Sequence, residues 1–366
     1  MMTIDSIVGA RPQFIKLAPI SRAFANRGDM VRHRIVHTGQ HYDQGMSDVF
    51  FEELEIPKPD IELHIGSAPH GQQTGAMLAA LELEFEAHRP DVILVYGDTN
   101  STLAATLAAT KMHIPVCHVE AGLRSFNREM PEEINRLVAD HCADRLYAPT
   151  PVAMRHLDRE GLAERSVLSG DVMLDAVRYN VGLAEKSSDV MARFGLTDRE
   201  FGIATIHRPI NTARDALVDI VEAFGRIAGN LPLVFPMHPR TRAVLDGALN
   251  IDPGLHIVEP LGYLDMLRAL GAARLVLTDS GGLQKEAAFL GTPCVTLREE
   301  TEWTETVEIG ANVLVGQSTD RLEEAVQKAL GRPPASWEPD IAEHYGDGNA
   351  AQKIVNDIID WRQTTI

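Results

Sequence analysis

Residues 91–124 read DVILVYGDTNSTLAATLAATKMHIPVCHVEAGLR. Two apolar runs rich in β-branched residues, 92–96 and 116–119, stand on either side of a helical pattern. The runs have the length of buried strands, and the residues between them suffice for a helix that crosses from one strand to the next. The stretch therefore predicts a strand-helix-strand unit with parallel strands.

The same alternation continues along nearly the whole chain. Further strands are expected at residues 3–8, 34–37, 145–148, 201–206, 233–236, 256–258, 275–278, 294–296 and 311–315. Helical patterns separate most of them, in two series. Two such series predict an α/β protein with two doubly wound, Rossmann-like domains, each with a parallel sheet covered by helices. We expect the boundary in the polar stretch 168–187.

Length and charge exclude several classes of protein. The chain has 366 residues, with 34 Lys and Arg against 52 Asp and Glu, so its formal net charge is −18. This balance argues against a nucleic acid or an anionic membrane as a partner. With 45% hydrophobic and 23% charged residues, the chain has ample material for folded cores. We therefore expect a globular protein and not a disordered one.

The sequence shows no targeting or cross-linking pattern. No run approaches the roughly 20 apolar residues of a membrane-spanning helix, and Asp5 lies where a signal peptide would be apolar. We therefore expect a cytoplasmic protein. Cys117, Cys142 and Cys294 are odd in number and widely spaced. Neither a disulfide framework nor a Cys-x-x-Cys motif is available to them.

Polar residues follow eight of the expected strands. In open α/β sheets the ligand lies beyond the carboxyl ends of the strands, so these positions are where chemistry is expected. They are residues 9–12, 37–41, 97–101, 120–122, 207–208, 238–240, 259–261 and 279–282. Their number predicts a ligand site in a cleft between the two domains.

The segment TDSGGLQKEA, residues 278–287, has the pattern of a phosphate-binding turn. Ser280, Gly281 and Gly282 would stand between a strand and a helix, where small residues let a phosphate approach the N–H groups of the helix start. Glu286 follows about one helical turn later, where a carboxylate could bind a ribose diol. The alternative is a tight turn with a serine cap and a solvated glutamate.

Arg11 and Lys16 provide a second group of candidates. They follow the first expected strand, and two cations beside the glycine at position 9 suit a pyrophosphate. The alternative is that both lie on the surface of an amphipathic helix. No GxGxxG follows the first strand and no Walker A sequence occurs, which disfavours nicotinamide chemistry and P-loop phosphoryl transfer.

Acidic residues gather at or near strand ends in the first half. They are Asp98, Glu120, Glu132 and Glu133. Carboxylates from different strands that converge on one cleft can differ in pKa and supply an acid and a base. The alternative is capping or ion pairing with Arg124 and Arg136. We favour catalysis for Asp98 and Glu120, whereas the residues alone do not choose between the two adjacent glutamates.

Histidines also follow strands. His207 with Arg208 could orient a phosphate or move a proton near neutral pH, although a lone histidine is more often structural. A metal site is not expected, because alternation along a strand at 116–119 points His118 away from Cys117.

With these residues assembled, the chain closely resembles the non-hydrolysing UDP-N-acetylglucosamine 2-epimerases. The resemblance covers nearly the full length and is specific, because several motifs occur together and in the family's order. They are GARPQFIKLAP, HTGQHYD, YGDTNST, HVEAGLRSF, MPEEINR, ATIHR, EPLGYLDM, TDSGGLQKEA and LREETEWTE.

The resemblance implies a GT-B architecture that binds a UDP-sugar, usually as a homodimer and without a redox cofactor. The first domain would be residues 1–170, completed by a C-terminal helix at about 350–366, and the second 171–349. The implied catalytic residues are Asp98, Glu120, Glu132 and His207. The implied substrate-binding residues are Arg11, Lys16, His207, Arg208, Pro260, Leu261, Ser280, Gly281, Gly282 and Glu286, with Pro260 and Leu261 near the uracil.

The resemblance also implies a mechanism. UDP leaves C1 of the sugar as the proton leaves C2, which gives 2-acetamidoglucal, and UDP then adds back with the proton delivered to the other face. The alternatives are an epimerase of a decorated UDP-sugar such as a 2,3-diacetamido uronic acid, a hydrolysing 2-epimerase, a GT-B glycosyltransferase and a UDP-sugar sensor without catalytic activity.

Two segments depart from the family's pattern. The family commonly has an acidic residue just before the asparagine that follows its His-Arg pair, whereas this chain has Pro209-Ile210-Asn211. Gln40 and His41 resemble part of a second, activating UDP-sugar site of some bacterial members, but the surrounding HYDQGMSD differs. Allosteric activation therefore stays open.

Overall fold

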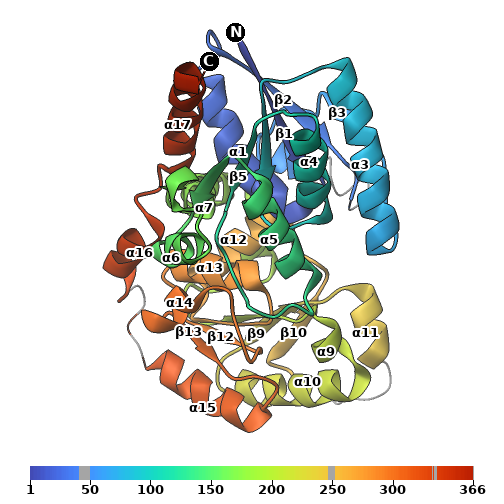
Figure 1. Ribbon diagram of the computed structural model, residues 1–366. Helices are drawn as coiled ribbons and strands as arrows, with labels where there is room; N and C mark the ends of the chain where they lie inside the picture. The colour runs from blue at the N-terminus through green and yellow to red at the C-terminus, as the bar shows by residue number, and fades with distance from the viewer. Residues whose placement is uncertain (41–49, 246–251, 332, 334–335, 366) are drawn as a thin grey trace. The chain divides into compact units, whose positions relative to one another are not determined.

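The computed structural model describes residues 1–40, 50–245, 252–331, 333 and 336–365. It divides into two compact units, each with its own sheet (Figure 1). Unit 1 consists of Met1–Ala176 and His344–Ile366, and unit 2 of Val177–Glu343. His41 lies outside the described residues, so the structure does not bear on its proposed role.

Unit 1 is built on a parallel sheet. Among the described residues this sheet has seven strands, in the order β3-β2-β1-β4-β5-β6-β7. Their bounds are Met2–Val8 (β1), Val31–His37 (β2), Ile61–Glu62 (β3), Val92–Tyr96 (β4), Val116–Val119 (β5), Arg145–Ala148 (β6) and Ser166–Leu168 (β7). The order reverses between β1 and β4, which pair directly from Ile4 opposite Val92 to Ile7 opposite Val95.

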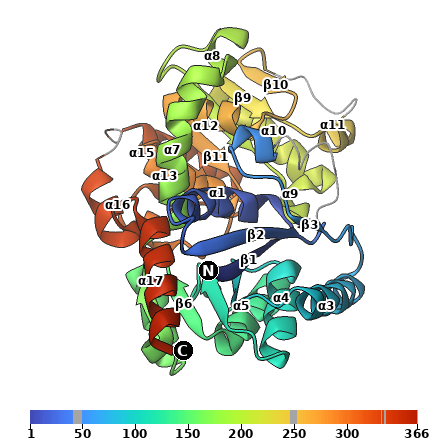
Figure 2. The same cartoon turned by 90° about the horizontal axis from the view of Figure 1, so that it is seen from above.

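The helices of unit 1 mostly connect these strands, and the last one comes from the end of the chain. They are α1 (Arg11–Ala25), α3 (His70–Ala87), α4 (Asn100–Lys111), α5 (Pro131–Cys142), α6 (Pro151–Arg159), the 3₁₀ helix η1 (Ala163–Arg165) and α17 (Ala350–Thr365). The last helix packs on α1 (Figure 1 and Figure 2). It is attached to β6 by Asp357, which accepts hydrogen bonds from Arg145 at 2.6 and 2.8 Å.

Unit 2 repeats this arrangement. Its described residues form a six-stranded parallel sheet in the order β10-β9-β8-β11-β12-β13. The strands are Gly202–Thr205 (β8), Leu233–Pro236 (β9), Leu255–Val258 (β10), Leu275–Thr278 (β11), Cys294–Thr296 (β12) and Asn312–Leu314 (β13). The reversal here lies between β8 and β11, which pair from Gly202 opposite Leu275 to Thr205 opposite Thr278.

The helices of unit 2 likewise mostly connect its strands. They are α8 (Val190–Arg193), α9 (Pro209–Thr212), α10 (Arg214–Ala228), α11 (Pro239–Leu245), α12 (Tyr263–Ala272), α13 (Gly281–Phe289), α14 (Thr304–Glu308), α15 (Thr319–Leu330) and α16 (Glu338–Tyr345). The boundary between the units falls within α7 (Val172–Ser187). The stretch 168–187 therefore contains a long helix. In the core, Phe224 of α10 meets Phe235 of β9 edge to face, with ring centroids 5.6 Å apart.

The predicted α/β class with two doubly wound, Rossmann-like parallel sheets is confirmed. The strands at 92–96, 116–119, 145–148, 233–236, 275–278 and 294–296 match to the residue, and the other expected strands differ by one to three residues at an end. The sequence pattern missed β3 and β7, because strands of two and three residues are too short to show alternation.

Candidate active site

Each sheet reverses its strand order once, and ligands of open α/β sheets bind beyond the carboxyl ends of the strands at such a point. In unit 1 the reversal lies between β1 and β4, which lead into Ala10 and Gly97. In unit 2 it lies between β8 and β11, which lead into His207 and Asp279. Most of the predicted site residues therefore lie at or near these two points.

A buried ion pair occupies the switch point of unit 1. Lys16 of α1 contacts Glu120, which follows β5, and both side chains are buried. A Cβ atom on Gly97 would lie 3.1 Å from Glu120 Oε2 and 3.2 Å from Lys16 Nζ, and Gly97 has φ of 60°. Only glycine combines this positive φ with the lack of a side chain that the close approach of Glu120 and Lys16 requires. Gly97 thus lets the ion pair pack against the backbone beside Asp98.

Glu120 itself has an uncommon backbone conformation. Its φ is 71°, in the left-handed region that few residues other than glycine adopt. The N–H groups of Glu120 and Ala121 both donate to the carbonyl oxygen of Tyr147, at 3.1 and 3.0 Å. These two bonds hold the turn in a conformation that sets the direction of the Glu120 side chain. Such strain is typical of functional sites.

Asp98 forms the second charged contact of this switch point. Its carboxylate lies 2.6 Å from Nη2 of Arg136, and its carbonyl oxygen accepts a hydrogen bond from Asn135 Nδ2 at 2.8 Å. Burial raises the pKa of the Asp98 carboxyl group above its usual value, and the charges of Arg136 and Lys16 only partly oppose this rise. A carboxyl group of raised pKa holds its proton more tightly than usual, which suits a general acid.

The two adjacent glutamates of α5 have different surroundings. Glu133 is buried and accepts hydrogen bonds from the N–H groups of Ser125 and Phe126, both at 2.9 Å, and from Arg136 at 2.7 Å. Burial would raise the pKa of Glu133, but these bonds outweigh it and lower the pKa. Glu132 is exposed in the first turn of the helix. Glu133 therefore holds a loop, whereas the carboxylate of Glu132 is accessible; the catalytic role of Glu132 stays a prediction.

Arg11 lies at the start of α1, on the same switch point. It is exposed, and its guanidinium group lies 4.5 Å from the centroid of the Phe50 ring.

Arg136, which pairs with both Asp98 and Glu133, was considered from sequence only as a structural partner. Its spacing of three residues from Glu133 in PEEINR was the available signal, because such residues are neighbours on a helix.

At the switch point of unit 2, one carboxylate accepts hydrogen bonds from several residues that follow β8. Asp279, fully buried, accepts hydrogen bonds from the N–H groups of His207 and Arg208 and from Asn211 Nδ2, at 3.1, 2.9 and 3.1 Å. It also lies 2.7 Å from His207 Nδ1. Burial would raise the pKa of Asp279, but the histidine and the other donors outweigh it and lower the pKa.

The contact with Asp279 orients His207. With Nδ1 donating to the carboxylate, the other ring nitrogen, Nε2, is left to interact with a ligand, and 60% of the side chain is exposed. Asp279 belongs to the polar residues 279–282 that follow an expected strand, but no role was predicted for it. Its position directly after β11, at the head of DSGG, was the signal that could have identified it.

Ser280, Gly281 and Gly282 form the expected turn at the start of α13. Ser280 is the N-cap residue, and its hydroxyl oxygen accepts a hydrogen bond from Leu283 N at 3.4 Å. A Cβ atom on Gly281 would lie 2.5 Å from Glu302 Oε1, so a side chain at this position would displace the end of the Glu302 side chain. The turn therefore brings bare backbone and a helix start together, as an anion site requires.

Three other predicted binding residues follow strands or helix starts of unit 2. Glu286 is buried in α13, about one turn beyond Gly282. Pro260 is exposed after β10, while Leu261 is half-buried and packs against the core. Each lies in the unit for which nucleotide binding was predicted, and their contacts with a ligand stay predictions.

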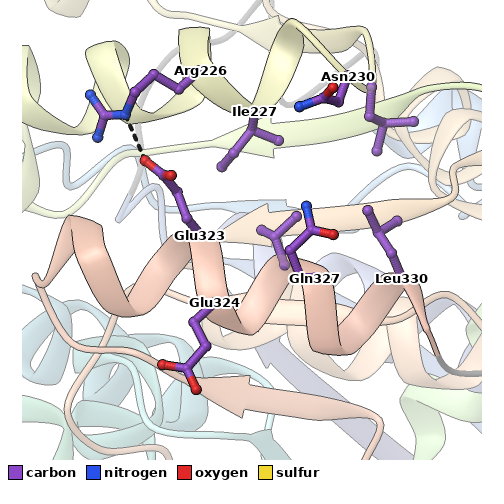
Figure 3. A pocket seen from close by; sticks show the side chains of 9 residues that line it. Arg226, Ile227, Asn230, Glu323, Glu324, Gln327 and Leu330 are labelled. Carbon is purple, nitrogen blue, oxygen red and sulfur yellow. Dashed lines mark hydrogen bonds and ion pairs between the residues drawn. The ribbon is translucent and has the colours of Figure 1, made fainter.

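A cavity of about 240 Å³ lies elsewhere on unit 2, between α10 and α15 (Figure 3). It is lined by Arg226, Ile227, Asn230, Leu231, Glu323, Glu324, Val326, Gln327 and Leu330. Arg226 Nε and Glu323 Oε1 form an ion pair at 2.6 Å across it. None of the lining residues is a predicted site residue.

Within the described residues, no group of three or more His, Cys, Asp or Glu side chains could hold a metal ion.

The family model described as UDP-N-acetylglucosamine 2-epimerase matches residues 23–359. The chain belongs to this family. A relative in Methanocaldococcus jannaschii, the UDP-N-acetylglucosamine 2-epimerase, is 42% identical over 365 residues, which cover 97% of this chain and 98% of the relative. The predicted membership in this family of isomerases is confirmed.

The family also contains a relative with another named substrate. The UDP-2,3-diacetamido-2,3-dideoxy-D-glucuronate 2-epimerase of Pseudomonas aeruginosa is 46% identical over 359 residues, 96% of this chain and 98% of the relative. Among solved structures, the M. jannaschii UDP-GlcNAc 2-epimerase in complex with UDP-GlcNAc and UDP has a TM-score of 0.87 and 41% identity, covering 98% of this chain and all of that one. No helix of the described residues is long and apolar enough to span a membrane.

Proposed function

We propose that this member of the family is a non-hydrolysing epimerase that interconverts UDP-N-acetylglucosamine and UDP-N-acetylmannosamine. The observation that carries the proposal is the cluster at the switch point of unit 1. There the Lys16–Glu120 pair packs against Gly97, and the next residue is Asp98, whose pKa is raised. A family that inverts C2 needs such an arrangement of proton donors and acceptors.

The reaction must move a proton that is not acidic by itself. C2 of the sugar has no neighbouring carbonyl group, so its proton leaves only as the C1–O bond breaks. The electron pair of the C2–H bond forms the C1=C2 double bond, and that of the C1–O bond leaves with UDP. Return of UDP and of a proton to the opposite face of C2 gives the epimer. No atom changes its oxidation state overall, so the reaction requires no redox cofactor.

We assign the proton transfers to unit 1. Glu120, which contacts the ammonium group of Lys16, would act as the base. The raised pKa of Asp98 suits an acid, and Glu132 offers a third, exposed carboxylate. Each group exchanges its role in the reverse reaction. Arg11 would bind the diphosphate or sugar by its positive charge.

We assign the nucleotide to unit 2. The N–H groups at the start of α13, with Ser280, Gly281 and Gly282, would bind the diphosphate and stabilise it as it leaves. His207 and Arg208 would contact the same anion, and His207 would also act in catalysis. The ribose would bind Glu286, and the uracil would lie near Pro260 and Leu261.

A decorated sugar is the second candidate substrate. The named activity of the P. aeruginosa relative favours UDP-2,3-diacetamido-2,3-dideoxy-D-glucuronate, and the same relative covers nearly all of this chain. The bond changes at C1 and C2 would be identical, because the substituents at C3 and C6 take no part in them.

We also propose that the enzyme is a cytoplasmic homodimer with residues 1–170 and about 350–366 as the catalytic domain and 171–349 as the nucleotide-binding domain. Light scattering after size-exclusion chromatography tests the assembly. Two chains of 40.2 kDa support the dimer, and a single chain excludes it.

Proton NMR of the purified protein in deuterated water tests the reaction. With UDP-N-acetylglucosamine we expect UDP-N-acetylmannosamine that carries deuterium at C2. Free N-acetylmannosamine and UDP would instead identify a hydrolysing enzyme, and UDP release that depends on an acceptor would identify a transferase. Turnover of the diacetamido-uronate alone would select the second candidate. Binding of both sugars without turnover would indicate a sensor.

A further inference from the structure

His118 is a fully buried histidine for which the proposed reaction has no direct use. It lies on β5, two residues before Glu120, and its side chain is 0% exposed. Its Nδ1 lies 2.7 Å from Asp140 Oδ1, and its Nε2 lies 2.7 Å from the carbonyl oxygen of Gly97. Both ring nitrogens thus face oxygen atoms at hydrogen-bond distance.

The partners of His118 decide how many protons the ring carries. A carbonyl oxygen only accepts, so Nε2 must donate to Gly97. Asp140 Oδ2 accepts from Arg124 Nη1 at 2.7 Å and from Gly122 N at 3.0 Å, so this carboxyl group is held as a carboxylate. Nδ1 must therefore donate as well. Burial would raise the pKa of Asp140, but His118 and Arg124 outweigh it and lower the pKa.

The charges around the ring balance. Asp140 comes from α5, and Arg124 from the turn after β5. Arg124 in turn donates to both carboxylate oxygens of Glu160, at 2.8 and 2.7 Å. On the neighbouring strands β4 and β6, the residues in register with His118 are apolar, Val95 and Leu146. Two positive and two negative groups form a neutral cluster, which reduces the cost of burying a charged ring.

This cluster joins the two turns that carry the proposed acid and base. The bond from His118 to Gly97 fixes the residue directly before Asp98. The bond from Gly122 N to Asp140 fixes the turn that follows Glu120. We propose that His118 is a positioning residue whose two ring nitrogens both donate hydrogen bonds, and that its pair with Asp140 sets the placement of Asp98 relative to Glu120.

Nitrogen NMR tests the charge of the ring without reference to any reaction. In protein labelled with ¹⁵N-histidine, an imidazolium gives two similar nitrogen shifts, whereas a neutral ring gives two widely separated ones. We expect the similar pair for His118 at neutral pH, because both ring nitrogens face hydrogen-bond acceptors. The signal is assigned by its loss in His118→Gln or, if that variant does not fold, by its change in Asp140→Asn. A neutral pattern in the wild-type protein would overturn the proposal.

Kinetics test the positioning role, which rests on the proposed epimerase function. Asp140→Asn keeps the shape of the side chain and removes its charge, so we expect kcat to fall by about 10- to 100-fold with KM changed less than threefold. Asp144→Asn is the matched control, because Asp144 accepts a hydrogen bond from Val116 N at the opposite end of β5, at 2.9 Å. Its kcat should equal that of the wild type.

The outcomes separate the two proposals. If Asp140→Asn folds and turns over like the wild type, the positioning role is wrong. If Asp140→Asn does not fold, the nitrogen spectrum of the wild-type protein still decides the charge of His118. If the wild type turns over no UDP-sugar, the proposed function is wrong, while the same spectrum supports or overturns the protonated ring.

Discussion

The two units share a strand order and differ in what they place at its reversal. Unit 1 presents charged side chains, with Lys16 against Glu120 and Asp98 against Arg136. Unit 2 presents backbone and small residues. Asp279 accepts hydrogen bonds from the N–H groups of His207 and Arg208 and so fixes the loop that follows β8. The first arrangement suits proton transfer, because the basic side chains hold the carboxylates in place and burial raises the pKa of Asp98. The second suits an anion, because N–H groups and a helix start attract negative charge.

The largest expected effect follows from neutralising the base of unit 1. Glu120→Gln should lower kcat by about 10²- to 10⁴-fold, the usual contribution of a general base. The dissociation constant of UDP should change less than about threefold, since we assign the nucleotide to unit 2. Steady-state kinetics and calorimetry with UDP measure the two quantities. Glu129→Gln, at an exposed glutamate, is the control.

A loss of UDP affinity as large as the loss of kcat would contradict this division of labour between the units. Equal activity of Glu120→Gln and the wild type would remove Glu120 from the chemistry.

A smaller effect is expected when the anion turn of unit 2 is filled. Gly281→Ala would place a Cβ atom 2.5 Å from Glu302 Oε1, so the flexible end of the Glu302 side chain must move, and the added methyl group would lie beside the N–H groups of the helix start. We expect UDP to bind about 3- to 10-fold more weakly, a cost of roughly 1 kcal/mol. Gly271→Ala is the control, because the nearest atom to its Cβ would lie at 3.8 Å. Unchanged calorimetric binding of UDP to Gly281→Ala would show that the turn does not hold the diphosphate.

The smallest effect concerns stability and compares two buried aspartates. Asp279 accepts several hydrogen bonds, whereas neither carboxylate oxygen of Asp5 has a hydrogen-bond partner among the described residues; Arg34 lies 3.4 Å away. Burial raises the pKa of Asp5 to about 7. The folded protein therefore binds the proton of Asp5 more tightly than the unfolded chain does. The contribution of Asp5 to the free energy of unfolding is highest when its carboxyl group is protonated in both states, at a pH below 3.8, and it falls as the pH rises through about 7.

Asp5→Asn removes that loss. We expect its melting temperature at pH 8 to exceed that of the wild type by about 4 °C, with a difference that shrinks as the pH falls toward 4. Thermal denaturation over this pH range measures it, with Asp29→Asn at an exposed position as the control. A lower melting temperature for Asp5→Asn at pH 8 would mean that the contact with Arg34 outweighs the burial of charge.

Most of the fold could be predicted from local pattern. Strands such as β4, β5 and β11 are short apolar runs bounded by glycine, proline or polar residues, so their ends are visible in the sequence. The two strands that were missed, β3 and β7, pair with β2 and β6 through two and three residues. Their existence depends on the neighbouring strand and not on their own composition.

The candidate site was predicted in part. Strand ends directed attention to Asp98, Glu120, His207 and Ser280, because a parallel sheet places these ends on one edge. The sequence did not distinguish Glu132 from Glu133, since both lie in the first turn of α5. It also missed Asp279 as the residue that orients His207, because a hydrogen-bond acceptor is identified only by its donors.

The sequence by itself determined which segments are strands, which residues follow them and which family the motifs resemble, because these properties depend on residues that are close along the chain. Tertiary structure decided which of those residues meet. Lys16 and Glu120 are 104 positions apart, and His118 and Gly97 are 21 apart. Their contacts exist because parallel pairing brings β1, β4 and β5 side by side, and no local pattern specifies the protonation or direction of a side chain that depends on another strand.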